Sequence, residues 1–189
     1  MSKEFFAVFP TFLGLNRTEE IKGRPLAGVP STGDIKTDFV LKYYDLAVKI
    51  GKQFGINPVI ILAQAAIESG WGTSPLARLH NNFFGITGYG ANNEYWKGTK
   101  YLSKSSGIAF RVYNTVGSGF ADFARLLVTK YPQAAKASES ITGYAALISS
   151  SPYINEKAGD NRAKYKELII RNAAAIITIS KKKYLSLYN

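Results

Sequence analysis

The stretch ILAQAAIESGWGTSPLA at residues 61–77, followed closely by NNFFGI at residues 81–86, carries the strongest structural signals in the chain. Just before it, Asn57 offers a polar helix cap and Pro58 occupies the first helical position, which together mark a helix start. The helix predicted over residues 59–69 is apolar almost all round, as is typical of a buried central helix. We therefore expect the rest of the chain to pack around this segment.

An acid ends this apolar helix. Glu68 is the only acidic residue between Asp45 and Glu94. Apolar surroundings and the negative end of the helix dipole both disfavour its charged form and raise its pKa. A carboxyl that stays protonated near neutral pH is what a general acid needs. Trp71 follows, flanked by two glycines, and is costly to place unless it lines a cleft or packs in the core. On these residues alone, Glu68 is either a catalytic acid or an ordinary surface residue of a last helical turn.

Two further groups of residues suit sugar recognition. Asn81 and Asn82 offer donors and acceptors, and Phe84 offers a flat apolar face; the alternative is a turn followed by core phenylalanines. Aromatic side chains in the next segment can stack on sugar rings or on nucleic-acid bases, and the alternative for them is cross-strand packing. The members of this second group are Tyr89, Tyr95, Trp96 and Tyr101.

Working outward, helical periodicity alternates with one short β region. The glycine at position 55 is expected to end the first helix, and Asp34 or Thr37 to cap its start. A hairpin turn is predicted at residues 105–107. The helices expected besides the central one cover residues 38–54, a segment after Gly119, 141–149 and 161–179; the strands expected cover 95–96, 99–102 and 108–113. This pattern predicts an α+β fold.

Composition excludes several kinds of chemistry. The 189 residues include no cysteine, which excludes disulfides, thiol nucleophiles and zinc–cysteine sites. The single histidine, His80, excludes a multi-histidine metal site, and we interpret it as a loop or capping residue. The net charge of +11 favours a polyanionic partner, which leaves nucleic acid, an anionic membrane and the bacterial cell wall as candidates.

The two quoted motifs, together with FRVY at 110–113 and SPYINEKAGDNRAKYKELI at 151–169, resemble the bacterial glucosaminidase family of peptidoglycan hydrolases, which includes flagellar and autolysin-type endo-β-N-acetylglucosaminidases. The resemblance covers residues 38–177. It implies a lysozyme-like fold in which a cleft separates a helical lobe from a small β-hairpin lobe. It also implies hydrolysis of N-acetylglucosaminyl β-1,4 bonds in peptidoglycan glycan strands, with no cofactor and no metal.

The resemblance implies roles for individual residues. Glu68 matches the catalytic acid and Tyr153 the functional tyrosine, while Asn82, Phe84 and Tyr113 fall on cleft-lining or supporting positions of the family. Together with these three, the residues singled out above by their chemistry are expected to bind substrate: Trp71, Asn81, Tyr89 and Trp96. The sequence departs from the family where many members carry a second acid in the β lobe, because residues 98–108 contain none. Three interpretations follow. Glu94 acts as the second carboxylate, the N-acetyl group of the substrate acts as nucleophile, or the site binds without cleaving.

Alternatives to the leading function are a muramidase or lytic transglycosylase on the same polymer, and a non-catalytic wall-binding component of a phage or secretion apparatus. Nucleic acid is not an expected partner, because no nucleic-acid-binding motif is found. Residues 34–189 are expected to form the catalytic domain. Residues 1–33, which are aromatic and rich in glycine and proline, are interpreted as an extension that docks onto a phage particle or secretion apparatus.

The expected place of action is the bacterial cell wall or periplasm. No convincing signal peptide is recognised at the N-terminus, so a phage-encoded, particle-borne or non-classically exported protein is expected. The apolar stretches fall short of the roughly 20 residues that a membrane-spanning helix needs.

Overall fold

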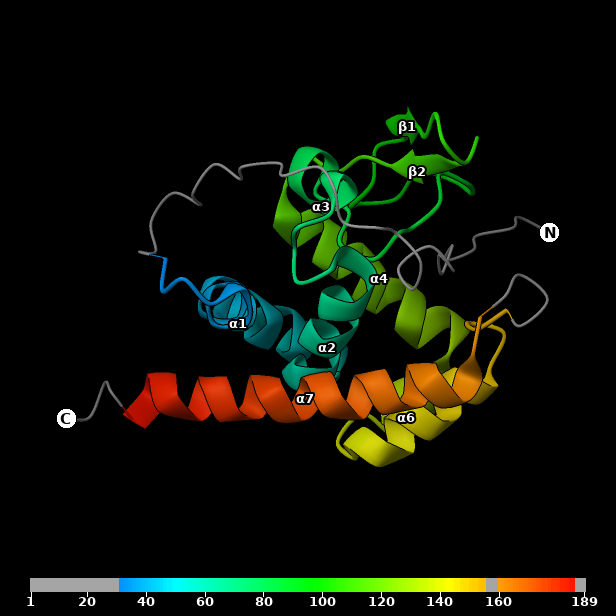
Figure 1. The fold of residues 1–189 in the computed structure, drawn as a ribbon. Helices are drawn as coiled ribbons and strands as arrows, with labels where there is room; N and C mark the ends of the chain where they lie inside the picture. The colour runs from blue at the N-terminus through cyan, green and yellow to red at the C-terminus, as the bar shows by residue number, and fades with distance from the viewer. Residues whose placement is uncertain (1–30, 156–159, 186–189) are drawn as a thin grey trace.

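A computed structural model describes residues 31–155 and 160–185 of the chain. In this part, helices form most of the molecule and a single two-stranded sheet forms a small lobe above them (Figure 1). This arrangement confirms the predicted α+β, lysozyme-like class. The elements in chain order are α1 (Ile35–Phe54), α2 (Pro58–Ser69), α3 (Pro75–His80), β1 (Lys100–Leu102), β2 (Ala109–Arg111), α4 (Val116–Lys130), α5 (Pro132–Lys136), α6 (Ile141–Ser150) and α7 (Arg162–Leu185).

Helix α2 is the centre of the helical lobe and packs against α1 and α7. Its start follows the prediction, because the Asn57 side chain accepts a hydrogen bond from the backbone N–H of Val59 at 2.9 Å and Pro58 lies in the first turn. Gly70 ends the helix in the left-handed conformation, with φ of 58°, which a residue without a Cβ adopts at little cost. Nearly every residue between these ends is buried, which confirms the expected central helix.

Helix α1 begins at Ile35, three residues before the predicted start at residue 38. Asp34 is the cap: its carboxylate accepts hydrogen bonds from the backbone N–H and the hydroxyl of Thr37, at 3.0 and 2.6 Å. The Asp38 carboxylate in turn accepts from Ser31 and from Thr32. Most of the expected docking extension, residues 1–30, lies outside the described residues.

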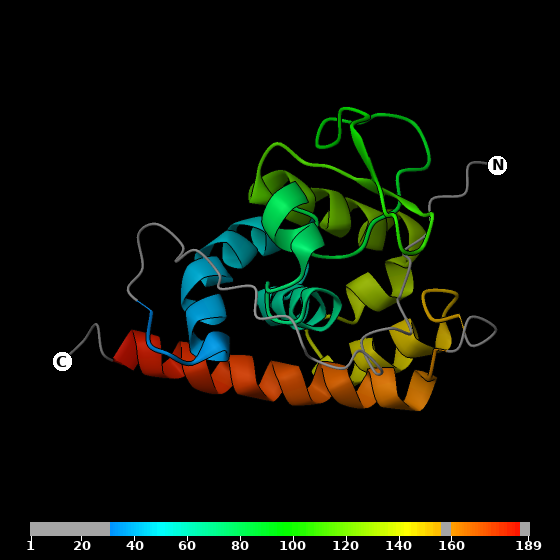
Figure 2. The ribbon, with the colours of Figure 1, turned by 45° about the horizontal axis from the view of Figure 1, so that its top comes forward.

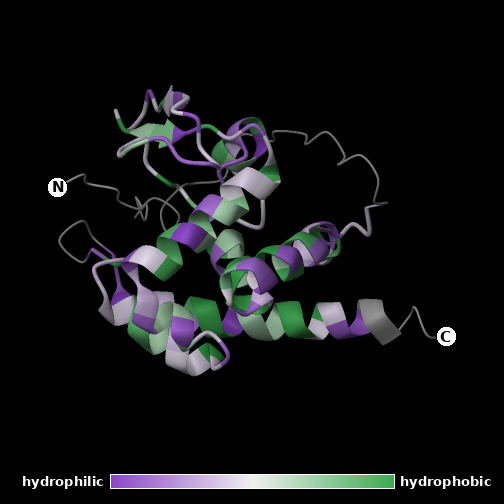
Figure 3. Cartoon of the chain, turned by 180° about the vertical axis from the view of Figure 1, so that it is seen from behind, coloured by the Kyte–Doolittle hydropathy of each residue, from purple (hydrophilic) through white to green (hydrophobic). Residues whose placement is uncertain are grey.

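Helix α7 runs past both α2 and α6, as the two views in Figures 1 and 2 show. It starts one residue later than expected and continues to Leu185, beyond the predicted end at residue 179. Its buried residues Ile169, Ala173 and Ile176 recur at helical spacing and face the core. Seen from behind, hydrophobic residues dominate the middle of this helix and polar ones its C-terminal part (Figure 3). No helix in the described part of the chain is long and apolar enough to cross a membrane.

The β lobe is smaller than the sequence predicts. Strands β1 and β2 pair antiparallel with Tyr101 opposite Phe110, and the turn between them covers residues 104–106. Residues 95–96 are not a strand, because the side-chain oxygen of Asn93 accepts the backbone N–H groups of Tyr95 and Trp96 and holds them in a turn. Helix α3 was not predicted; Ser74 caps it and a proline occupies its first turn.

Candidate active site

Glu68 lies in the last turn of α2, partly buried, beside two tyrosines from the C-terminal part of the chain. Its Oε1 atom accepts a hydrogen bond of 2.6 Å from the Tyr165 hydroxyl of α7. The same oxygen accepts a second one, of 3.2 Å, from the hydroxyl of Tyr153, which follows α6. The structure thus brings Glu68 and Tyr153 together, as expected, and adds Tyr165 to them.

A second row of buried polar groups lies behind these three. Gln64, one turn earlier on α2, donates from Nε2 to the Tyr165 hydroxyl oxygen at 3.0 Å. The Tyr144 hydroxyl, from α6, donates to Oε1 of the same glutamine. Gln64 and Tyr144 are fully buried, and Tyr165 nearly so. Groups from three helices therefore form one continuous hydrogen-bond chain that ends on the Glu68 carboxyl.

Burial raises the pKa of Glu68 from its ordinary value of 4.5 to about 7. The hydrogen bonds from Tyr165 and Tyr153 favour the charged form and oppose this rise, while the negative charge of Asp160 adds to it. A carboxyl with a pKa near 7 holds its proton in an appreciable fraction of molecules at neutral pH. This is the property that a general acid requires.

Trp71 adjoins this carboxyl in an unusual backbone conformation. It is a non-glycine residue with φ of 58°, between Gly70 and Gly72, which also have positive φ. Such a conformation costs about 1–2 kcal/mol for a residue with a Cβ. Its ring packs edge-on against Phe39, with centroids 5.6 Å apart, yet remains partly exposed. The side chain therefore packs in the core and stays partly exposed, three residues after Glu68, and it remains a candidate for substrate contact.

The two asparagines of the NNFFGI motif have structural partners. Asn81 ends α3 and donates to the backbone oxygen of Tyr113 at 2.9 Å. Asn82 is buried; it donates to the backbone oxygens of Ile86 and Arg111 and accepts from the N–H of Ile86. Its amide is used in joining the loop to β2, so it supports the site and does not bind substrate directly.

Three aromatic residues that were expected to bind substrate lie in the core. Phe84 is fully buried and stacks on Phe123 with ring centroids 3.8 Å apart. Trp96 is buried and donates from Nε1 to the backbone oxygen of Thr99 at 2.8 Å. Tyr113 is buried as well. Direct substrate contact requires an exposed face, so the structure corrects these three assignments to supporting roles.

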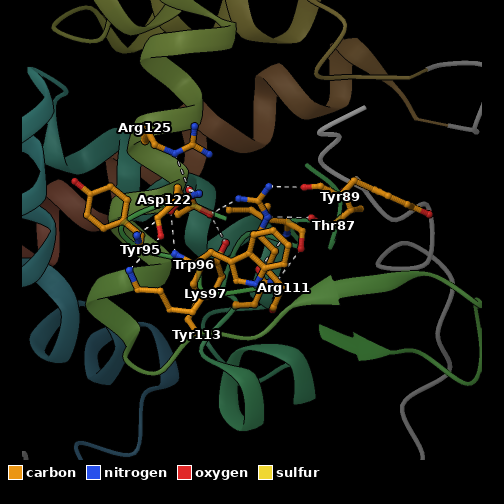
Figure 4. Close-up of polar contacts among 12 residues, drawn as sticks. Thr87, Tyr89, Tyr95, Trp96, Lys97, Arg111, Tyr113, Asp122 and Arg125 are labelled. Atoms are coloured by element: carbon orange, nitrogen blue, oxygen red, sulfur yellow. Dashed lines mark hydrogen bonds and ion pairs between the residues drawn. The ribbon is translucent and has the colours of Figure 1, made fainter. Parts of the chain in front are cut away.

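Trp96 and Tyr113 belong to a buried polar cluster that ties the β lobe to α4 (Figure 4). Its centre is an ion pair between Arg111 and Asp122, 2.6 Å apart and both fully buried. The Tyr113 hydroxyl donates to this aspartate at 2.8 Å, and the guanidinium lies 4.2 Å from the Trp96 ring centroid. Arg111 also donates to the backbone oxygen of Tyr89 at 2.6 Å. The cluster fixes the position of the lobe.

Two other aromatic candidates remain accessible. The side chain of Tyr89 is 50% exposed and points away from the polar cluster (Figure 4). Tyr101, 39% exposed, stacks on the ring of His80, with centroids 4.3 Å apart. His80 is the last residue of α3, close to the capping position that was predicted. Because half of Tyr89 is exposed, Tyr89 remains a candidate for substrate binding.

Glu94 lies away from Glu68. It is exposed and precedes Tyr95, whose ring packs on Phe54 at the end of α1. Trp71, three residues after Glu68, packs instead on Phe39, near the start of the same helix. At 1.5 Å per residue, these two contacts are separated by roughly 22 Å along α1. The structure therefore does not bring the two carboxylates together.

Sequence reasoning missed Tyr165, Tyr144, Gln64 and Asp160. One signal was present, because a single glutamine inside an otherwise apolar buried helix requires hydrogen-bond partners. The tyrosines that supply or receive those bonds are more than 75 positions away, so no local pattern identifies them. Within residues 31–155 and 160–185, no group of three or more histidine, aspartate or glutamate side chains is placed to hold a metal ion.

Comparison with known proteins decides the family. The glucosaminidase family, described as mannosyl-glycoprotein endo-beta-N-acetylglucosaminidase, matches residues 44–184, which is most of the chain. The chain belongs to the glucosaminidase family. The chain is 32% identical over 133 residues to "Peptidoglycan hydrolase FlgJ" of Salmonella typhimurium, covering 63% of the chain and 40% of that protein. It is 38% identical over 80 residues to "Probable N-acetylmuramidase" of Lactococcus lactis, covering 40% and 18%.

Among solved structures, the glycoside hydrolase domain of Salmonella typhimurium FlgJ superposes with a TM-score of 0.60 at 26% identity. The superposition covers 82% of this chain and 98% of that domain. The catalytic domain of the autolysin Auto from Listeria monocytogenes gives the same TM-score at 22% identity, over 82% and 91%. The curated relatives are considerably longer, since the chain spans well under half of each one described here.

Proposed function

We propose that this chain is a glycoside hydrolase that cleaves the glycan backbone of bacterial peptidoglycan at N-acetylglucosaminyl β-1,4 bonds. The observation that carries the proposal is the Glu68 carboxyl, partly buried at the end of α2, with a pKa raised to about 7 and two tyrosine hydroxyls on one of its oxygens. Family membership and the names of the relatives support the substrate class. The net charge of +11 suits an anionic wall polymer.

Glu68 acts as the general acid in this proposal. Its protonated carboxyl transfers the proton to the glycosidic oxygen while the bond from that oxygen to the anomeric carbon breaks, and the leaving glycan departs with a free hydroxyl. Water then adds to the anomeric carbon, and its proton returns to the Glu68 carboxylate. The net reaction consumes one water molecule and regenerates the acid.

The attacking group is best assigned to the substrate. A second carboxylate has to lie within about 5–9.5 Å of the acid to act in either two-carboxylate scheme. Glu94, the only acid in the β region by sequence, is exposed and precedes Tyr95, whose ring packs on Phe54 at the end of α1, whereas Trp71 after Glu68 packs on Phe39 near the start of that helix. We therefore propose that the N-acetyl oxygen of the substrate attacks the anomeric carbon as the glycosidic bond breaks, and that the incoming water then displaces this oxygen and restores the acetamide. Tyr153 is itself only 2% exposed and donates to the Glu68 carboxyl at 3.2 Å, so we propose that it helps this step by orienting that carboxyl.

Substrate contacts are proposed for residues that keep an exposed face. Trp71 is partly exposed three residues after Glu68, Asn81 is partly exposed at the end of α3, and Tyr89 is half exposed on the β lobe. Aromatic faces stack on the apolar faces of sugar rings, and an amide offers both a donor and an acceptor to sugar hydroxyls.

A muramidase is the second candidate. One observation favours it: the stretch of highest identity among the relatives described above is to a protein named as a probable N-acetylmuramidase. Both enzymes would use the same acid and differ in which sugar occupies the position before the scissile bond.

The product identifies the bond. Purified sacculi are digested and the soluble fragments are analysed by mass spectrometry after borohydride reduction. Reduced N-acetylglucosamine at the fragment ends supports the proposal. Reduced N-acetylmuramic acid reassigns the chain as a muramidase, and an anhydro-muramic end as a lytic transglycosylase. Binding to sacculi without release of any fragment leaves a non-catalytic wall-binding component.

The proposed place of action is the bacterial cell wall or periplasm, where this polymer lies. Residues 1–33 are proposed to dock the domain onto a phage particle or secretion apparatus. Co-purification of the full chain with such a particle, lost when residues 1–33 are deleted while hydrolysis of isolated sacculi is kept, is the expected result. Unchanged co-purification after the deletion contradicts it.

A further inference from the structure

We propose that Tyr144, Gln64 and Tyr165 form a one-directional hydrogen-bond relay that fixes the transferable proton of Glu68 on its Oε2 atom. The three are positioning residues, because they act on the acid and not on the substrate. The inference rests on the proposed role of Glu68 as general acid, and it concerns which of the two carboxyl oxygens delivers the proton.

The direction of the relay follows from the chemistry of its members. The Tyr144 hydroxyl donates to Oε1 of Gln64, so the carbonyl end of the amide faces α6. The NH₂ end therefore faces Tyr165 and donates to its hydroxyl oxygen at 3.0 Å. An amide NH₂ accepts no hydrogen bond. The single hydrogen of the Tyr165 hydroxyl is therefore directed at Glu68, 2.6 Å away.

This polarity decides where the acid carries its proton. Both hydrogen bonds that the described residues make to the carboxyl end on Oε1, from Tyr165 and from Tyr153. A proton on that oxygen would point at two hydroxyl hydrogens, and Tyr165 would have to turn its own hydrogen away from the carboxyl, toward the neighbouring Tyr153 hydroxyl. The favourable place for the proton is Oε2. In this arrangement Oε2 carries the proton and is the oxygen that meets the substrate, as a general acid requires.

Burial keeps the hydrogen bonds of the relay in one direction. Gln64 and Tyr144 have no solvent exposure and Tyr165 almost none, so water does not compete for these bonds. A buried polar group that loses its partner is costly, which holds the Gln64 amide in one orientation. The titratable groups that face Glu68 are Tyr144 from α6, Tyr165 from α7, and Tyr153 and Asp160 from the segment between these helices. The tyrosines are all held neutral, since burial raises their pKa values well above 10.

The relay is tested by titrating Glu68 itself, without substrate. The eight glutamates are labelled with ¹³C at the carboxyl carbon, and Glu68 is assigned from the spectrum of Glu68→Gln. In Tyr144→Phe the Gln64 amide loses its donor, so it can turn its carbonyl oxygen toward the Tyr165 hydroxyl. That hydroxyl then donates to Gln64 and no longer donates to Glu68. We expect the pKa of Glu68 to rise by about one pH unit, since a hydrogen bond to a charged group is lost. An unchanged pKa overturns the relay.

A second measurement reports the position of the proton. When the proton lies on Oε2, Oε1 is the carbonyl oxygen and accepts two hydrogen bonds, which lowers the frequency of the infrared C=O stretch of the protonated acid. Tyr165→Phe removes one of them, and the stretch is expected to move to higher frequency. A stretch that does not move contradicts the placement of the proton.

Controls separate the relay from general effects of mutation. Tyr113→Phe removes a buried hydroxyl that donates to a different carboxylate, Asp122, and is expected to leave the Glu68 titration unchanged. If Tyr144→Phe does not fold, Tyr144→Met serves the same purpose, because it also leaves the Gln64 carbonyl without its donor, and it is expected to raise the same pKa. Folding of each variant is checked by its backbone amide spectrum.

The titration and the digestion of sacculi fail independently. A shifted Glu68 titration in Tyr144→Phe with no fragments from wild-type digestion leaves the relay standing and rejects the proposed function. Active hydrolysis with an unshifted Glu68 titration rejects the relay and supports the proposed function.

Discussion

Replacing Glu68 by glutamine is expected to stabilise the folded protein at high pH. The pKa of Glu68 is about 7 in the folded state against 4.5 ordinarily, so between these values the folded state holds a proton that the unfolded state has released. Stability from this group therefore falls as pH rises from 4.5 and is fully lost above about 7. Glutamine has nearly the same shape, carries no charge, and keeps an oxygen that accepts from Tyr165 and Tyr153.

The size of the effect follows from the difference between the two pKa values. At about 1.4 kcal/mol per pH unit, the difference between 4.5 and about 7 corresponds to about 3 kcal/mol. At pH 8, Glu68→Gln is therefore expected to unfold with a free energy larger than that of the wild type by about 3 kcal/mol. For a chain of this length that is an increase in melting temperature of roughly 6–12 °C. At pH 4.5 this contribution disappears.

Urea unfolding of both proteins at pH 4.5 and pH 8 measures the effect. The quantity to compare is the difference in unfolding free energy between variant and wild type at each pH. Glu94→Gln is the matched control, since it makes the same substitution at an exposed carboxyl. A Glu68→Gln difference that does not change with pH would refute the argument that burial holds this acid in its protonated form.

Three further outcomes are expected. Hydrolysis by the wild type should decline as pH rises through about 7, because the acid loses its proton there; a rate that keeps rising to pH 9 speaks against Glu68 as the acid. Glu94→Gln should keep the rate of sacculus hydrolysis within about twofold of wild type. A rate lower by roughly 10²–10⁴-fold, which is typical of losing an acid–base group, restores the two-carboxylate scheme. Asp122→Asn should lower the unfolding free energy by about 3–5 kcal/mol in urea titrations, because it leaves the Arg111 charge buried and unpaired; a change below about 1 kcal/mol contradicts this role for the ion pair.

Local signals were sufficient to predict the helical framework. The Asn57–Pro58 start, the glycine ends at positions 55 and 70, and the apolar run between them are each determined by a few neighbouring residues. The strand expected at residues 95–96 was wrong because one side chain, Asn93, captures both backbone N–H groups in a turn. Helix α3 is only six residues long, too short to show a periodic pattern.

The site was predictable only in part. Glu68 is conspicuous as a lone acid in an apolar helix, and the resemblance added Tyr153. Trp96 and Tyr113 were expected to face the substrate because aromatic residues in a short β region are ambiguous by sequence. The structure shows that they pack around the buried Arg111–Asp122 pair, a contact between β2 and α4 that depends on tertiary folding.

The central claim is that Glu68 is the acid of a peptidoglycan hydrolase, and release of soluble fragments from purified sacculi tests it most directly. Wild type and Glu68→Gln are compared at pH 6, with sacculus binding and thermal unfolding measured on the same samples. The account predicts that Glu68→Gln binds sacculi and folds as well as the wild type but releases fragments at least about 100-fold more slowly. Release at the wild-type rate by Glu68→Gln contradicts it.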